Sequence, residues 1–219
     1  MENKVKKEIY DALVKIKARD FEGAESLLQS LLKKAQEIPS QEGRAEQALI
    51  LSTLGVLEKV REDYKAAWRY YEKAEKILPD DPSLKLIMAQ LMINEFSQYD
   101  VAIKKMNSVI ELAKGSPSFE HQAYATMAMA YLRKGDRKKA LEMFEKSMKG
   151  DFAEMTSSQN INLDVIETFL ARNFESERCR TYLEKALALA KSKKESSQVA
   201  LFNKLLLAFA KPVEVHSVH

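Results

Sequence analysis

Hydrophobic residues recur along this chain every three to four positions, with polar and charged residues between them. Ile9, Leu13 and Ile16 share one face of a helix in the first such segment, and the same spacing returns at Leu28 and Leu31. This is the period of an amphipathic α-helix, and segments with the strict alternation of a half-buried strand are missing. The pattern predicts a chain built of helices.

Residues that start helices stand between these segments. Asp20, Asp63 and Asp136 are each placed to cap the helix that follows, by accepting hydrogen bonds from its free N–H groups. Asp81-Pro82 supplies a cap and a first-turn proline together. Near the C-terminus, Ser196 or Ser197 is expected to cap the last helix.

Small residues at the centre of each segment recur about every 40 positions, which is the range of helical repeats. The stretch 51–82 carries the most complete pattern, and it resembles a tetratricopeptide repeat (TPR), with Glu58 in a place where an aromatic residue is usual. The residues that carry the resemblance are Leu51, Leu54, Gly55, Ala67, Tyr71, Ala74 and Pro79. The small residues Gly55 and Ala67 are expected to let two antiparallel helices approach closely, with Tyr71 filling the space beside them.

The resemblance implies an all-α fold, a right-handed superhelical solenoid of about five helix-turn-helix pairs plus a C-terminal helix. We expect a single domain over residues 1–212. The expected repeats are 4–38, 44–80, 81–115, 117–150 and 157–192, followed by a terminal helix over 195–210 and a flexible tail over 213–219.

Composition narrows the choice of partners and location. Only six glycines and five prolines in 219 residues favour long helices with short connections. The net charge is +3 with interleaved signs, so we expect neither nucleic acid nor a membrane as partner. The N-terminal segment lacks the apolar core of a signal peptide and the longest apolar run, 205–210, is too short to span a bilayer, so a cytoplasmic location is expected.

Few residues suggest chemistry. The single cysteine, Cys179, takes the small position that alanine fills in other repeats, and a buried thiol is unreactive. His121 stands at the start of a helix, and His216 and His219 in the tail make a poor metal site. Phosphate-binding loops and nucleophile motifs are missing. We expect no catalytic residue, no cofactor and no metal, and hence not an enzyme.

In the family that the chain resembles, the first helix of each pair lines a concave groove that binds a ligand. Carried onto this sequence and combined with the apolar helix 84–96, the expected groove residues are Ser52, Val56, Lys59, Ile87, Met88, Leu91, Ala125, Met129, Arg133 and Arg172. The helix 84–96 is apolar on almost every face. Either it forms the floor of the groove, or its register simply buries it more deeply, and both explanations stay open at this point.

The function expected from this pattern is that of a non-enzymatic adaptor whose groove binds a peptide or amphipathic helix of another protein. Replacing Leu91 and Met129 with Asp is expected to abolish binding and to leave helicity intact. The alternative is a structural subunit that self-associates, as a homodimer for example, through its apolar C-terminal helix. The residues expected at that interface are Leu201, Phe202, Leu205 and Phe209.

Overall fold

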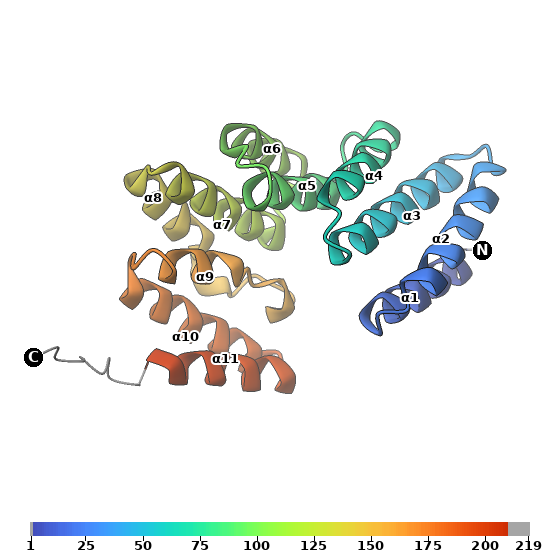
Figure 1. Ribbon diagram of the computed structural model, residues 1–219. Helices are drawn as coiled ribbons and strands as arrows, with labels where there is room; N and C mark the ends of the chain where they lie inside the picture. The colour runs from blue at the N-terminus through green and yellow to red at the C-terminus, as the bar shows by residue number, and fades with distance from the viewer. Residues whose placement is uncertain (1, 210–219) are drawn as a thin grey trace, which may run out of the picture. The chain divides into compact units, whose positions relative to one another are not determined.

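The computed structural model describes residues 2–209, apart from the side chains of residues 2–4, 151 and 208. Over this range the regular structure is entirely helical (Figure 1), so the predicted all-α fold is confirmed. The helices are α1 (Glu2–Lys17), α2 (Phe21–Gln36), α3 (Gln41–Val60), α4 (Tyr64–Ile77), α5 (Pro82–Asn94), α6 (Tyr99–Leu112), α7 (Pro117–Lys134), α8 (Arg137–Ser147), η1 (Lys149–Phe152), η2 (Ser158–Asn160), α9 (Asp164–Leu170), α10 (Ser176–Ser192) and α11 (Ser196–Phe209), where η marks a 3-10 turn.

The chain divides into two compact units, the first ending at Gln98 and the second beginning at Tyr99. In the first unit α1 to α5 pack in sequence, each on the next, and in the second α7 packs between α6 and α8 while α10 packs on α9 and α11. Helices that contact mainly their neighbours in sequence are typical of a helical repeat. The single superhelical domain over 1–212 stays a prediction, and the predicted tail over 213–219 lies outside the described residues.

Most of the predicted helix starts are confirmed. The carboxylates of Asp20, Asp63 and Asp136 each accept a hydrogen bond from the backbone N–H three residues further on, at 3.0, 2.9 and 3.0 Å. The exception is α11, which begins at Ser196, so the prediction that Ser196 or Ser197 caps it is wrong. The residue before this helix is a glutamate, Glu195.

The close approach of α3 and α4 depends on Gly55. A Cβ atom added there would lie 2.3 Å from a ring carbon of Tyr71, which is far inside van der Waals contact. Tyr71 and Ala67 are fully buried on the facing helix. The predicted notch, in which a small residue admits an aromatic ring, is therefore present.

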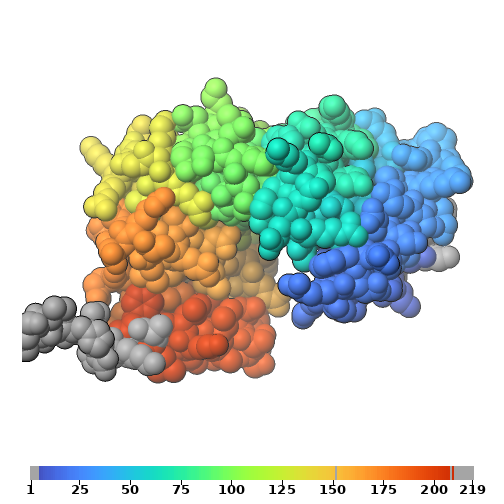
Figure 2. Space-filling model, in the orientation of Figure 1, coloured from blue at the N-terminus to red at the C-terminus, as the bar shows by residue number. Residues whose placement is uncertain are grey.

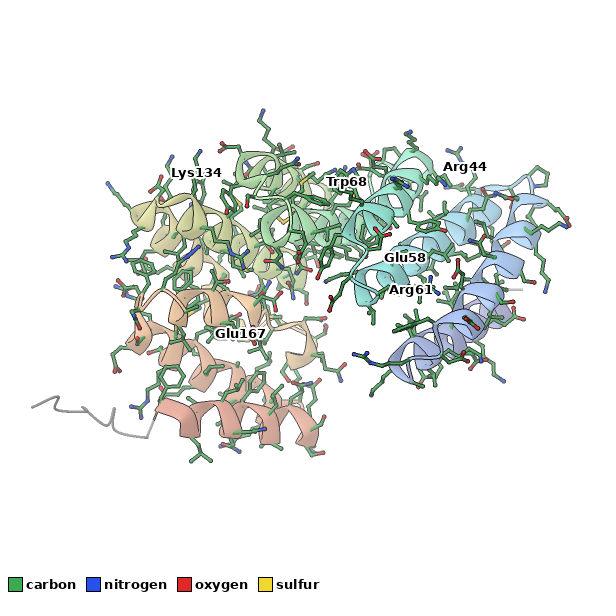
Figure 3. The ribbon with its side chains drawn as sticks, in the orientation of Figure 1. Arg44, Glu58, Arg61, Trp68, Lys134 and Glu167 are labelled. Carbon is green, nitrogen blue, oxygen red and sulfur yellow. The ribbon has the colours of Figure 1, made fainter. Side chains whose placement is uncertain are left out.

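The glutamate at the usual aromatic position of this repeat is accommodated by an ion cluster. Glu58 is buried, and its Oε1 accepts a hydrogen bond of 3.0 Å from the Arg61 guanidinium (Figure 3). The same guanidinium lies 2.8 Å from a carboxylate oxygen of Glu25 and 5.7 Å from the centre of the Phe21 ring. The Arg61 guanidinium thus neutralises a carboxylate that replaces an apolar ring and ties α3 to α2.

In the second unit, the chain between α8 and α9 is irregular. The turns η1 and η2 occupy much of it, and α9 is only seven residues long. Glu167, which stands where a small residue is usual, is exposed and so does not enter the helix interface (Figure 3). A short first helix leaves room for this loop to pack against α7 and α10.

Candidate functional site

The expected groove residues on α3 reach the surface to different degrees. Ser52 and Val56 are partly buried, and Lys59 is exposed. Two further apolar residues of α3, Leu49 and Val60, are 42% and 43% exposed. These two residues were not among the predicted groove residues, although their helical spacing from Ser52 and Val56 could have revealed them.

We call Leu49, Val56 and Val60 the α3 stripe. At 100° per residue their side chains leave the helix within about 40° of one another. Ser52 and Lys59 lie beside them on the same helix face. The α3 stripe is thus a narrow band of apolar side chains with a hydroxyl and a cation along its edge.

Four of the five other apolar groove residues expected from the sequence are buried. Met88 and Leu91 of α5 are 1% and 2% exposed, and both belong to a core cluster with Tyr71 and Leu84 of the same unit. Ala125 and Met129 of α7 are fully buried. Buried side chains offer no surface to a partner, so these four are not part of the surface considered below.

The apolar character of α5 follows from its depth in the protein. Seven of its thirteen residues are buried, and Ile87 is partly buried. Of the two explanations for this helix, the structure supports the one in which its register buries it more deeply. Aspartate at Leu91 or Met129 would place a charge in a core, so this double substitution is now expected to destabilise the fold and does not isolate the effect on binding.

In the second unit, Arg133 is partly buried at the end of α7 and Arg172 is exposed just after α9. On α11, Phe202 is buried, Leu205 and Phe209 are partly buried, and Leu201 is 37% exposed. The helix α11 packs against α10 and presents its other side at the surface (Figure 2). The side of α11 that carries Phe202 is thus already occupied by the chain itself.

Cys179 lies in the small position of α10 and is fully buried. Burial raises the pKa of its thiol to about 12. At neutral pH the residue is a thiol and not a nucleophilic thiolate. The prediction that this cysteine is structural agrees with this environment.

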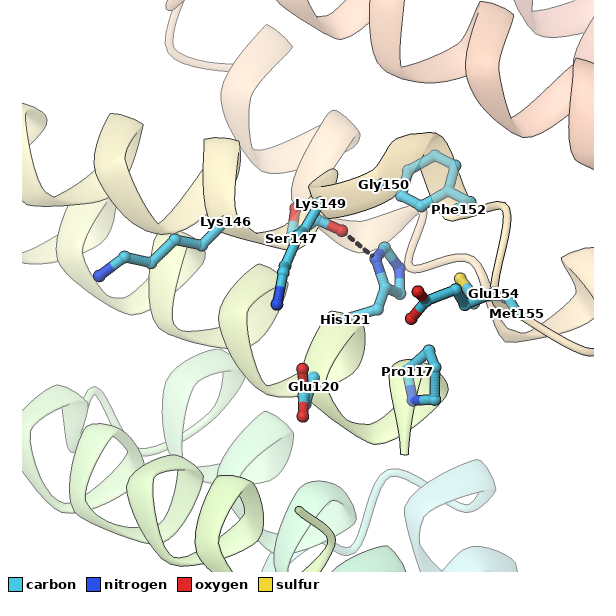
Figure 4. Close-up of a pocket in the computed structure, with 10 residues that line it drawn as sticks. All are labelled: Pro117, Glu120, His121, Lys146, Ser147, Lys149, Gly150, Phe152, Glu154 and Met155. Atoms are coloured by element: carbon cyan, nitrogen blue, oxygen red, sulfur yellow. Dashed lines mark hydrogen bonds between the residues drawn. The ribbon is translucent and has the colours of Figure 1, made fainter. Parts of the chain in front are cut away.

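A buried polar network in the second unit is centred on His121, which lies near the start of α7. Its Nδ1 lies 2.8 Å from the carbonyl oxygen of Ser147 (Figure 4). Because a carbonyl can only accept, Nδ1 carries the proton and Nε2 is the acceptor. Nε2 accepts a 3.0 Å hydrogen bond from the backbone N–H of Asn162 and lies 3.2 Å from the Tyr182 hydroxyl, which donates to the Asn162 carbonyl at 2.7 Å.

Desolvation lowers the pKa of His121 to about 4, against an ordinary value of 6.5. The imidazole is thus neutral at pH 7 and holds three chain segments together. A cavity of about 70 Å³ lies beside it, with Glu120, Glu154, Lys146 and Lys149 among the residues that line it (Figure 4). Both ring nitrogens are already bonded to the protein, so the imidazole has a structural role here and no free atom for a ligand. The sequence analysis missed this network because its members are far apart in the chain.

A carboxylate, that of Glu195, anchors the irregular loop between α8 and α9. Glu195 accepts hydrogen bonds from the Ser157 hydroxyl at 2.6 Å and from the Ser158 backbone N–H at 2.9 Å, and the Ser158 hydroxyl also contacts it. These hydrogen bonds lower the pKa of the Glu195 carboxyl, and the bond from the Ser157 hydroxyl has the largest effect. The loop is fastened to the turn before α11 by a charged acceptor.

Metal sites and membrane spans are absent from residues 2–209. No three His, Cys, Asp or Glu residues come together there in a way that could hold a metal ion. None of the helices in this range has the length and apolar character needed to cross a membrane. His216 and His219, the two histidines of the tail, lie outside the described residues.

Comparison with known proteins gives one partial sequence relative. No model of a known protein family matches the chain. A segment of 89 residues is 34% identical to the pentatricopeptide repeat-containing protein 1, apicoplast, of Plasmodium falciparum. The match covers 41% of this chain and 14% of that protein, so the chain spans a small part of this relative's length.

Solved structures match a larger share of this chain than the sequence relative does. The structure of BtubC from P. vanneervenii has a TM-score of 0.62 at 20% identity, over 95% of this chain and 82% of that one. The structure of PilF from Pseudomonas aeruginosa has a TM-score of 0.59 at 16% identity, over 95% of this chain and 92% of that one. Similarity at this level of identity concerns the fold alone.

The structure and these neighbours together define the class of protein. Packed helix pairs, the Gly55 notch and the aspartate caps are those of an all-α helical-repeat protein. Within that class, the fold of this chain is of the tetratricopeptide-repeat type.

Proposed function

We propose that this chain is a non-enzymatic protein-interaction scaffold that binds a peptide or amphipathic helix of a partner protein on the α3 stripe. The observation that carries the proposal is the exposure of Leu49 and Val60, 42% and 43%, on the face that the TPR resemblance assigns to the ligand. Exposed apolar residues that are aligned on one helix face form a surface that a partner can cover.

The α3 stripe suits a partner with an apolar edge. Full burial of a Leu or Val side chain contributes roughly 1.5–3 kcal/mol, so covering side chains that are already more than half buried contributes about 1 kcal/mol each. Lys59 beside the stripe favours an acidic residue in the partner. Ile87, Arg133 and Arg172, which retain some exposed surface, remain candidates for further contacts.

The test uses peptides selected from a random library on the purified protein, followed by affinity measurements on the wild type and two variants. Leu49→Glu with Val60→Glu places charges on the α3 stripe at exposed positions, so the protein should stay folded. Val101→Glu is the matched control, because Val101 is an equally exposed valine, 46%, on α6. We expect the double variant to lose about tenfold or more in affinity and the control to lose little. Failure to select any peptide, or equal binding by the double variant and the wild type, would overturn the proposal.

A second candidate function is self-association through α11, which one observation favours. Leu207 is 67% exposed and Leu201 is 37% exposed on this helix. Because Phe202 is buried within the chain, deleting the whole helix would expose core and confuse the result. We therefore expect light scattering to separate the cases through Leu201→Glu with Leu207→Glu. A dimer that these substitutions dissociate would support assembly, and a monomeric wild type would exclude it.

A further inference from the structure

An apolar pocket lies in the first unit where α1, the end of α2 and the start of α3 meet. Its cavity volume is about 220 Å³. The apolar residues that line it are Val5, Leu31, Ala35, Ile38 and Ile50. None of them belongs to the α3 stripe, so this is a separate surface.

The walls of this pocket are held in place by the connection between α2 and α3. The Gln47 side chain donates to the Ala35 carbonyl at 3.0 Å, and the Ser40 hydroxyl accepts from the Gly43 N–H at 3.0 Å. A Cβ atom at Gly43 would lie 2.3 Å from the Ile38 carbonyl oxygen, so this glycine permits the close approach of α3 to Ile38. The pocket is therefore formed before any ligand arrives, which lowers the entropy cost of binding.

Charged residues at the pocket are mainly acidic. Glu8 of α1 and Glu42 and Glu46 of α3 line it, and Lys34 is the basic residue among the described residues that do so. The first turn of α3 explains Glu42, because a carboxylate suits a helix N-terminus. It does not explain why a third glutamate, from another helix, lies at the same pocket. The net field at this pocket favours a cation next to the apolar cavity.

The volume sets the size of the apolar group. A cavity of about 150 Å³ in another protein is large enough to bind benzene, so a cavity of this size accepts one aromatic ring with its attached carbon. The residue types that match are phenylalanine and the branched aliphatic ones.

We propose that this pocket captures a single phenylalanine-sized side chain of a partner peptide whose adjacent residues are lysine or arginine. The inference rests on the proposed function in one respect, which is that the partner is a protein. The side chain enters the cavity and contacts Val5 and Ile38, the two apolar lining residues that are only partly buried, and the flanking cations meet Glu8, Glu42 and Glu46. The pocket thereby adds a second specificity, for basic and apolar sequence, to the α3 stripe.

The experiment follows the methyl resonances of Ala35, Ile38 and Ile50 by NMR in the full chain. Three probes are titrated, which are the N-acetylated, C-amidated tripeptides Lys-Phe-Lys, Lys-Ala-Lys and Glu-Phe-Glu. We expect Lys-Phe-Lys to shift these methyl groups in a saturable way. Lys-Ala-Lys should leave them unchanged, and Glu-Phe-Glu should bind at least about threefold more weakly, as expected for exposed charges. No shift with Lys-Phe-Lys, or equal binding of the acidic peptide, would overturn the proposal.

Two sets of variants locate the binding. Ala35→Leu fills the cavity and should abolish the shifts of the Ile50 methyl groups. Glu42→Gln with Glu46→Gln keeps the packing and should lower the affinity for Lys-Phe-Lys by about threefold. The affinity for Glu-Phe-Glu should not fall in this variant. The charge control is Glu72→Gln, at an exposed glutamate of α4 that does not line the pocket. Unaltered binding in both pocket variants would reject the assignment.

The α3 stripe variant separates this proposal from the proposed function. If Leu49→Glu with Val60→Glu still binds Lys-Phe-Lys while losing library-selected peptides, both proposals hold. If the wild type shows no shift with Lys-Phe-Lys but still binds the selected peptides on α3, the pocket proposal is rejected and the proposed function is not. A tripeptide signal without any α3-dependent peptide would instead reject the α3 stripe.

Discussion

Lowering the pH from about 7 to about 5 is expected to destabilise the second unit through His121. The folded protein holds this imidazole neutral, with a pKa of about 4, whereas the unfolded chain has the ordinary value of 6.5. Between these values the unfolded state binds a proton that the folded state does not. Stability therefore falls as the pH drops from 6.5 toward 4, and it is unaffected above this window.

The magnitude follows from the size of the shift. In full it corresponds to about 3 kcal/mol, of which about 2 kcal/mol is lost by pH 5. The main physical reason is desolvation of the buried imidazole, which disfavours its charged form. A proton on Nε2 would also face the backbone N–H of Asn162, 3.0 Å away, and leave that donor without an acceptor. Glu120, Glu154 and Lys149 line the cavity beside His121, so a reference variant that keeps these charges is needed.

Urea unfolding at pH 7 and pH 5, followed by a probe in the second unit such as the amide protection of α10, measures the loss. The reference is His121→Gln, which has no titrating group at position 121. All other titrating groups, the tail histidines included, are the same in the variant and the wild type. We expect the wild type to lose about 2 kcal/mol more than the variant over this pH change. An NMR titration of His121 in the wild type keeps the reasoning testable if the variant does not fold. A measured pKa near 6.5, or equal losses in the two proteins, would refute it.

Three further predictions concern other parts of the chain. Gly55→Ala should lower the free energy of unfolding by about 1–3 kcal/mol, measured by chemical denaturation, because its Cβ would overlap the Tyr71 ring, and a change below about 0.5 kcal/mol would contradict the notch. Cys179 should react with a thiol reagent at neutral pH only as fast as the protein unfolds, and rapid stoichiometric labelling of the folded protein would contradict its burial. Glu195→Ala should speed amide exchange at Ser158, which hydrogen-exchange mass spectrometry of the loop before α9 can measure, and unchanged exchange would show that the carboxylate does not hold the loop.

Local signals in the sequence were enough to locate the helix pairs. Asp63 caps the N-terminus of α4, and Gly55 leaves space for the Tyr71 ring. Both effects depend on residues within one repeat. A capping residue needs only the next turn of its own helix, and a notch needs only the partner helix of the pair. Such short-range requirements leave a pattern at fixed spacing, and the repeat spacing revealed it.

The candidate site was harder to predict because it depends on which side of a helix faces a neighbour. Met88 and Met129 were expected in a groove but are buried, whereas Leu49 and Val60 were passed over and are exposed. A helix that is apolar on most sides carries no periodic signal that separates its outer from its inner face. Only the packing of adjacent helices decides that question.

The sequence by itself determined the all-α repeat architecture, the aspartate caps and the buried, unreactive state expected of Cys179. The tertiary structure alone decided the network of His121, whose partners Ser147, Asn162 and Tyr182 lie 26, 41 and 61 residues further along the chain. The tertiary structure also brought Glu8, Glu42 and Glu46 together at the apolar pocket of the first unit. Contacts of such separation follow from how helices stack and leave no trace in local spacing, because any residue that satisfies the same geometry could have supplied them.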